Sequence, residues 1–128
     1  MKKFVICLIM LAFLVGLATY EVVAVKGIIS YIDNSIENLI PFYEENEEDI
    51  TVVAEKLQEL EDFWDDRECT MCIMFNHKDL SMVSDSLNRL NSYTKNNNYD
   101  DAIAEIHLLE EYIEKAEHIM GFNVHNVL

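Results

Sequence analysis

Glycine and proline are scarce in this sequence, which contains three glycines and one proline among 128 residues. Phosphate-cradling loops, tight two-residue hairpin turns and calcium-binding loops all depend on glycine. None of these motifs occurs, and neither does the nucleophile elbow of the hydrolases. We therefore expect no catalytic residue and no cofactor, and we expect that the chain is not an enzyme.

Basic residues are also few, with 9 lysines and arginines against 24 aspartates and glutamates and a net charge of -15. A surface this acidic is repelled by the phosphates of nucleic acids and by anionic lipid headgroups. The composition therefore excludes non-specific binding to nucleic acid. It is compatible with cations or basic partners, and it does not choose between them.

The acidic residues are absent from one long apolar run, residues 4–20, which follows Lys2 and Lys3. As a helix, these 17 residues span about 26 Å, close to the ~30 Å hydrocarbon core of a bilayer. The length favours a retained anchor, with residues 1–25 as the anchor segment and residues 4–25 in the membrane. Val22-Val23-Ala24 resembles a cleavage site, so a cleaved signal peptide is the alternative.

Lys2 and Lys3 also predict the orientation of this anchor, because positive charges stay on the cytoplasmic side. The amino terminus is then inside, and residues 26–128 form an acidic domain outside the cytoplasm. We therefore expect a single-pass protein of the cell membrane.

Beyond residue 22, apolar residues recur every three or four positions. This is the spacing of helices that bury one face against neighbouring helices. Arg67 falls on the stripe that runs from Ile50 to Met74 and is its only polar member. The four stripes consist of Val25, Ile28, Ile29, Ile32, Ile36 and Leu39; Ile50, Val53, Leu57, Leu60, Trp64, Met71 and Met74; Leu80, Val83, Leu87, Leu90 and Thr94; and Ala102, Ile106, Leu109, Ile113, Ala116 and Met120.

Four boundaries are predicted between and after these stripes. Pro41 is expected to stop the first helix, and Asn76 with Asp79 forms a capping pair at a break in the chain. Residues 95–101, KNNNYDD, form a turn, and Gly121 sits at a helix carboxyl cap. The predicted fold is all-α, with an amino-terminal transmembrane helix followed by an antiparallel up-down bundle of three or four helices.

The segment ECTMCIMFNH, residues 68–77, combines two cysteines with a histidine. A zinc site needs four ligands, and a thiol oxidoreductase places its cysteine pair at a helix start beside a strand. Neither pattern occurs, so we expect Cys69 and Cys72 to be small, polarizable residues that pack in the core beside Met71. A disulfide, or a metal bound by the two cysteines and His77, remains as an alternative.

His77 lies at the predicted break and is interpreted as a structural residue that caps or bridges helix ends. The alternative is a ligand or a pH-responsive contact, since histidine titrates near neutral pH. Trp64 lies on a stripe, and we expect it to be buried. The acid pairs Asp65-Asp66 and Asp100-Asp101 point in divergent directions on a helix and are interpreted as solvated.

The chain resembles a family known as domain of unknown function 4363, over residues 50–128. The residues that carry the resemblance are Trp64, the turn His77-Lys78-Asp79-Leu80, and the terminal Asn126-Val127-Leu128. The resemblance implies a small, helical, membrane-anchored bacterial protein and implies no mechanism. It does not extend to the two cysteines.

These features favour a non-enzymatic, membrane-tethered helical module that acts by contact with another envelope or membrane protein. The structural and interaction residues would be Trp64, Asn76, His77, Asp79, Leu80, Asn126, Val127 and Leu128, with the terminal segment FNVHNVL as an apolar tail beyond the last helix. One alternative is a bundle that senses a small ligand between its helices. Another is a metal- or thiol-bearing protein that uses Cys69, Cys72 and His77.

Overall fold

A computed structural model of the chain describes residues 1–46 and 49–127, with side chains as far as Gly121. Within these residues the chain is helical and contains no strand, which confirms the predicted fold class. The helices are α1 (Lys2–Glu37), α2 (Leu39–Glu45), α3 (Ile50–Met71), α4 (His77–Lys95) and α5 (Tyr99–Val127).

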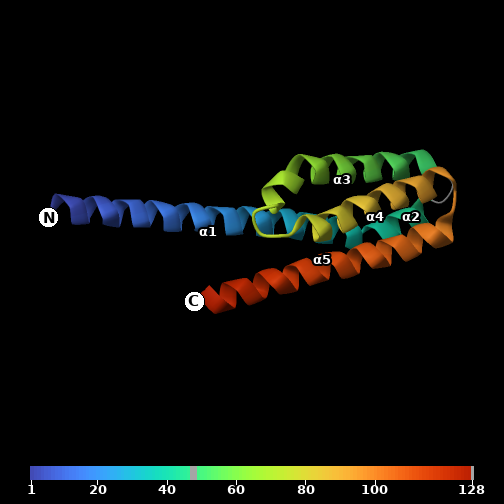
Figure 1. Cartoon of the computed structure of the whole chain (residues 1–128). Helices are drawn as coiled ribbons and strands as arrows, with labels where there is room; N and C mark the ends of the chain where they lie inside the picture. Colours follow the sequence, from blue (N-terminus) through green and yellow to red (C-terminus); the bar gives the residue numbers. More distant parts are fainter. Residues whose placement is uncertain (47–48, 128) are drawn as a thin grey trace.

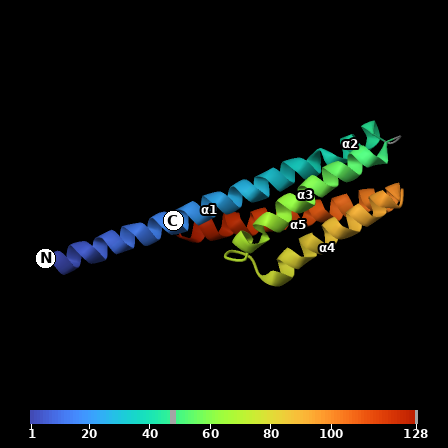
Figure 2. The ribbon, with the colours of Figure 1, turned by 90° about the horizontal axis from the view of Figure 1, so that it is seen from above.

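The helices form an antiparallel up-down bundle (Figure 1). α1 and α2 run outward as one arm, α3 returns, α4 runs outward again, and α5 returns beside α1 (Figure 2). α1 packs against α3 and α5, and α4 packs against the same two helices. We call the end where α2 meets α3 and α4 meets α5 the distal end. The opposite end, where α3 meets α4 and α5 terminates, is the proximal end.

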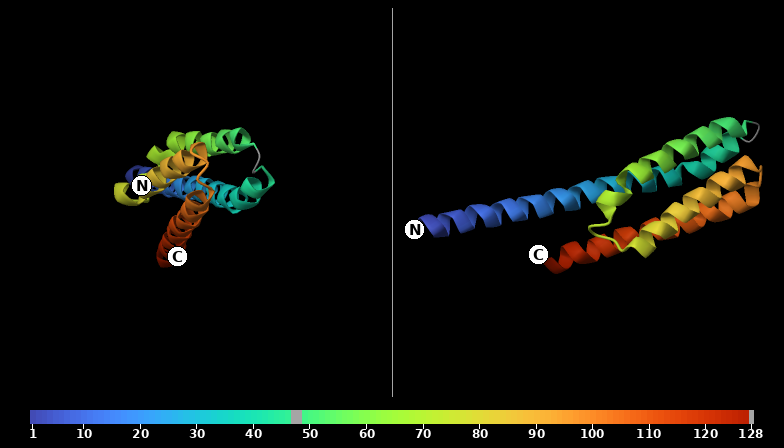
Figure 3. Two further views of the ribbon diagram at one scale, coloured as in Figure 1. Left: turned by 90° about the vertical axis from the view of Figure 1, so that its right-hand side faces the viewer. Right: turned by 45° about the horizontal axis from the view of Figure 1, so that its top comes forward.

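The amino-terminal half of α1 projects from the proximal end without a helix beside it (Figure 3). Residues 1–20 are all exposed, and the first buried residue is Val25. Within the described chain, the continuous arm Lys2–Glu45 is the one helix long and apolar enough to cross a membrane. α1 therefore supplies both the apolar segment and one side of the bundle core.

The helix that begins at Lys2 ends before Pro41, as predicted, but helical structure does not stop there. Proline cannot donate a backbone hydrogen bond, and its ring clashes with the carbonyl four residues earlier, which here belongs to Glu37. α1 accordingly ends at Glu37, but helical structure resumes after the single residue Asn38. Pro41 lies in the first turn of α2, where its missing N–H is tolerated.

The core confirms the four predicted stripes almost residue for residue. Ile50, Met74 and Ala116 are partly buried, and the other core-stripe residues are buried. Arg67, the charged member, is also partly buried, and its guanidinium carbon lies 3.9 Å from the centre of the Phe63 ring. The helical period of the apolar residues therefore located the core correctly.

The asparagine-rich connection between α4 and α5 is a turn, as predicted. Asn97 adopts a left-handed conformation with φ of 55°, which asparagine tolerates better than most residues. The N–H groups of Asn98 and Asn97 donate to the carbonyls of Tyr93 and Thr94, which closes the end of α4.

The predicted end of the last helix at Gly121 is wrong. α5 continues through Gly121 to Val127, so the segment FNVHNV extends the helix rather than forming a tail. Gly121 does not have the positive φ of a carboxyl cap. A glycine in a helix interior costs stability without necessarily ending the helix.

Candidate functional site

The connection between α3 and α4 is the part of the structure that brings the predicted site residues together. α3 ends at Met71, and the Phe75 N–H then bonds to the Met71 carbonyl at 3.0 Å. Met71 and Phe75 are both buried, so the connection is held to the bundle by two large apolar side chains. The predicted break near Asn76 is confirmed.

Asn76 caps α4 with two hydrogen bonds to Asp79, which confirms the predicted capping pair. Asn76 Oδ1 accepts from the Asp79 backbone N–H at 2.9 Å, and Asn76 Nδ2 donates to Asp79 Oδ2 at 2.7 Å. Leu80, the next residue, is buried in the core. The polar cap therefore orients the start of α4 while the adjacent leucine attaches it to the bundle.

Replacing Asn76 with Ala is expected to lower the free energy of unfolding by about 1 kcal/mol, because α4 loses its amino-terminal cap. Urea denaturation of the full chain in detergent micelles, followed by far-ultraviolet circular dichroism, measures this loss. Asn96→Ala is a matched control, since Asn96 is an exposed asparagine at the other end of α4 whose side chain has no described hydrogen bond. Equal effects of the two substitutions would contradict the capping role of Asn76.

The two cysteines of this connection lie in different environments. Cys72 is partly buried, packs against the core and places its Sγ 3.7 Å from His77 Nδ1. Cys69 is exposed, so the expectation that it is a core residue is wrong. Both thiols are free, and no three His, Cys, Asp or Glu residues are arranged to hold a metal ion in the described part of the chain. The structure thus brings Cys72 and His77 together as a pair.

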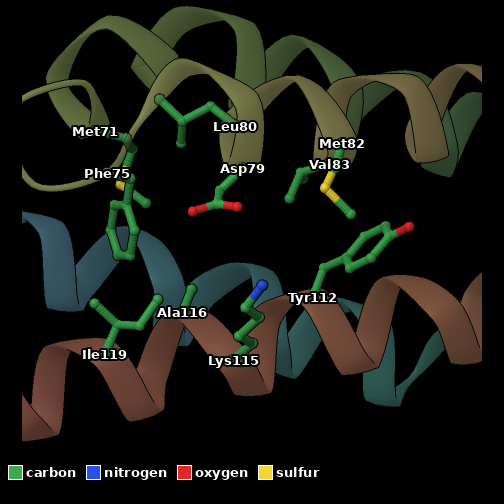
Figure 4. A pocket seen from close by; sticks show the side chains of 10 residues that line it. All are labelled: Met71, Phe75, Asp79, Leu80, Met82, Val83, Tyr112, Lys115, Ala116 and Ile119. Atoms are coloured by element: carbon green, nitrogen blue, oxygen red, sulfur yellow. The ribbon is translucent and has the colours of Figure 1, made fainter.

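A small cavity of about 30 Å³ adjoins this connection, between α4 and α5 (Figure 4). Phe75, Leu80 and Ile119 form its apolar wall. Asp79 of α4 and Lys115 of α5 both point into the gap between the helices. The volume is that of about one water molecule, so this cavity is too small for a metabolite.

Trp64 is buried on α3, as predicted, and also makes a polar contact that the stripe did not indicate. Its indole Nε1 donates to Ser84 Oγ of α4 at 2.7 Å. The exposed acid pairs Asp65-Asp66 and Asp100-Asp101 are solvated, also as predicted. The side chains of Asn126 and Val127, and all of Leu128, lie outside the described residues.

Sequence reasoning missed a charged network buried between α4 and α5. Glu105 is only 7% exposed, and its carboxylate accepts from Ser86 Oγ at 2.6 Å. Arg89 donates to the same carboxylate through Nη2 at 2.8 Å and Nε at 3.1 Å. Its position in the sequence could have indicated its burial, because Glu105 lies between Ala102 and Leu109 on the buried side of α5.

This network sets the ionisation of Glu105. Burial by itself raises the pKa of the carboxyl, but hydrogen bonds from Arg89 and Ser86 and the charge of Arg89 outweigh it, so the pKa is lowered. Glu105 is thus held as a carboxylate by two groups on the facing helix. Such an arrangement fixes the register of α4 against α5 and leaves the carboxylate oxygens already hydrogen-bonded.

The structure as a whole is a four-helix up-down bundle continuous with an apolar amino-terminal helix. The chain belongs to the family described as domain of unknown function 4363, whose model matches residues 23–127. The match confirms the resemblance and extends it toward the amino terminus, so that it covers the bundle part of α1. No curated protein and no solved structure matches the chain.

Proposed function

We propose that the protein is a membrane-tethered helical module whose acidic bundle stands outside the cytoplasm. The observation that carries the proposal is the continuity of α1, which passes from an exposed apolar segment to the buried Val25 without a linker. Lys2 and Lys3 before the apolar segment support an amino terminus inside the cell. A continuous helix would hold the bundle at a fixed height above the membrane.

The bundle would act by contact with another envelope or membrane protein. Its buried polar side chains are used to join helices to one another. Besides the Glu105 network, Asn91 Nδ2 of α4 donates to Glu61 of α3 at 2.9 Å, and the hydroxyls of Tyr43 and Thr94 link α2 with α4. These contacts support a rigid scaffold whose outer faces are available to a partner.

A single labelling experiment tests both orientation and contact. Single cysteines replace the exposed residues Glu55 of α3, Ser92 of α4 or Glu114 of α5, in a chain whose three native cysteines are serine. A membrane-impermeant maleimide that carries a photoreactive group is added to intact spheroplasts. All three variants are expected to be labelled from outside, and illumination is expected to give discrete crosslinks from one face of the bundle.

The cysteine-free chain is the control for this experiment. Labelling that occurs only after the cells are lysed would place the bundle inside and contradict the orientation. Labelling without a discrete crosslink from any of the three faces would leave the tether intact and contradict the contact function.

A cavity at the distal end favours a second function, the binding of a small ligand. Its volume is about 170 Å³, and the residues that line it include Tyr43, Tyr99 and Asn98. An apolar cavity of about 150 Å³ holds a benzene-sized molecule. The mixed lining suits a small aromatic compound with a polar substituent.

Ligand binding to this cavity would raise the melting temperature by mass action. Phenol and related small aromatics are expected to give a saturable rise in the parent protein. The rise should be smaller in Ala102→Val, because Ala102 is buried against the cavity and the added methyl groups reduce its volume. The absence of any saturable rise across such a series would contradict this second function.

A further inference from the structure

Charge is distributed very differently at the two ends of the bundle. Among the described residues, one distal connection contains Glu44, Glu45 and Asp49, and the other contains Lys95, Asp100 and Asp101. At the proximal end, residues 69–76 and residues 118–127 contain no aspartate, glutamate, lysine or arginine. Charged residues make up 26% of the whole chain, so two uncharged stretches at one end set that end apart.

The two uncharged stretches lie on the same side as the projecting apolar half of α1 (Figures 1 and 3). Met120 and Gly121 of α5 line one cavity together with Lys26 and Ile29 of α1. These two pairs of residues therefore lie side by side along the bundle axis. From Gly121, α5 runs on to Val127, a further distance of about 9 Å toward the apolar segment. We call residues 69–76 together with residues 118–127 the proximal face.

Ile73 gives the proximal face an exposed apolar residue at the tip of the connection between α3 and α4. Its exposure is 60%, against 45% for Tyr31 and 38% for Val52. These three are the large exposed hydrophobic residues that the structure describes after Val23. Tyr31 is covered in part by Phe63, whose ring centre lies 4.0 Å away. Among the side chains that the structure describes after Val23, Ile73 is thus the most exposed large apolar one.

We propose that the proximal face rests on the membrane that α1 crosses, at the lipid headgroups of its outer leaflet. Ile73 would lie among these headgroups. The inference relies on the proposed tether and adds a second contact with the bilayer. Lipid is the occupant that the structure favours, because the proximal face adjoins the helix that enters the membrane. The contact would hold the bundle at one rotation about α1 and keep its acidic distal end away from the surface.

The charge distribution favours the same orientation. Anionic headgroups repel acidic surfaces over roughly a Debye length, about 8 Å at physiological ionic strength. The proximal face is the part of the bundle that such headgroups would not repel. An exposed isoleucine is also more favourably placed at an apolar boundary than in water.

The experiment uses the full chain in phosphatidylcholine vesicles, with its three native cysteines replaced by serine. A nitroxide is attached to a single cysteine at position 73, at position 70, at position 96 or at position 10. Its collision rates with oxygen, which partitions into lipid, and with a water-soluble nickel chelate are measured by electron paramagnetic resonance. Thr70 is a second exposed site beside the tip, and Asn96 is an exposed site at the distal end.

Position 10 is expected to show hydrocarbon depth, and position 96 to be open to the nickel chelate. Position 73 should collide with nickel several-fold less than position 96 while remaining open to oxygen, and position 70 should show the same trend. A melting temperature equal to that of the cysteine-free parent shows that each labelled chain is folded.

Three other outcomes would each overturn a stated part of this proposal. If positions 73 and 70 resemble position 96 while position 10 is in hydrocarbon, the interfacial contact is wrong and the tether stands. If position 73 is shielded from both oxygen and nickel, a protein surface covers it and lipid is the wrong occupant. If position 10 is itself open to nickel, the tether is wrong as well.

Discussion

Replacing Trp64 with Ala is expected to lower the free energy of unfolding by about 3–5 kcal/mol, the largest effect of any single substitution considered for this bundle. Trp64 is among the largest fully buried side chains, and its removal leaves a cavity between α3 and α4. It also removes the hydrogen bond from Nε1 to Ser84 Oγ. Urea denaturation of the full chain in micelles, followed by circular dichroism, measures the loss without relying on tryptophan fluorescence.

Two further substitutions separate packing from hydrogen bonding at this position. Trp64→Phe keeps most of the apolar volume. Ser84→Ala removes the acceptor, together with the hydroxyl's own bond to the Leu80 carbonyl at 3.3 Å, and leaves Nε1 unpaired at a cost of about 1–3 kcal/mol. Each is expected to be less destabilising than Trp64→Ala. A Trp64→Ala protein with the denaturation midpoint of the parent would show that this residue does not support the core.

Replacing Arg89 with Ala is expected to cost about 2 kcal/mol, because the nearly buried carboxylate of Glu105 loses its charged partner. Breaking a fully buried ion pair typically costs ~3–5 kcal/mol. The value here is smaller because the Arg89 side chain is 44% exposed and solvent screens its charge. Lys56→Ala is the matched control, since the Lys56–Glu59 pair is exposed and contributes about 0.5 kcal/mol or less.

The same carboxylate makes the bundle sensitive to acid. Its pKa is lower in the folded protein than the ordinary value of 4.5, so the folded state binds the proton less readily than the unfolded state does. The stabilisation is therefore complete above pH 4.5 and is lost as the pH falls through the folded pKa. Denaturation midpoints of the parent should fall between about pH 5 and about pH 3 more steeply than those of Glu105→Gln. Parallel pH profiles for the two proteins would contradict this role.

Most of the fold could be predicted from the period of the apolar residues. Residues such as Val53, Leu87 and Ile113 recur at helical spacing, and burial of each stripe requires helices packed side by side. The capping pair Asn76 and Asp79 located the break between α3 and α4, because it is a local interaction between residues three apart. Local and periodic signals of this kind can be read without knowledge of the neighbouring helix.

Helical structure continues through both Pro41 and Gly121, contrary to expectation, for a shared reason. Each residue disfavours helix only by a local cost, and contacts between helices can outweigh that cost. Leu39 and Tyr43 are buried on either side of Pro41, and Met120 is buried immediately before Gly121. Packing against α5 and α1 thus maintains helical structure in both places, which no rule about one residue type could show.

The sequence alone determined that the protein is all-helical, that residues 4–20 are apolar and uncharged, and that all 24 acidic residues follow them. Those properties follow from composition and from spacing along the chain. Only the tertiary structure decided that Arg89 and Ser86 surround Glu105, that Cys72 lies beside His77 while Cys69 is exposed, and that the two uncharged stretches gather at the proximal end. The reason is that these contacts join residues of different helices or positions around a turn, and their geometry depends on how the helices pack.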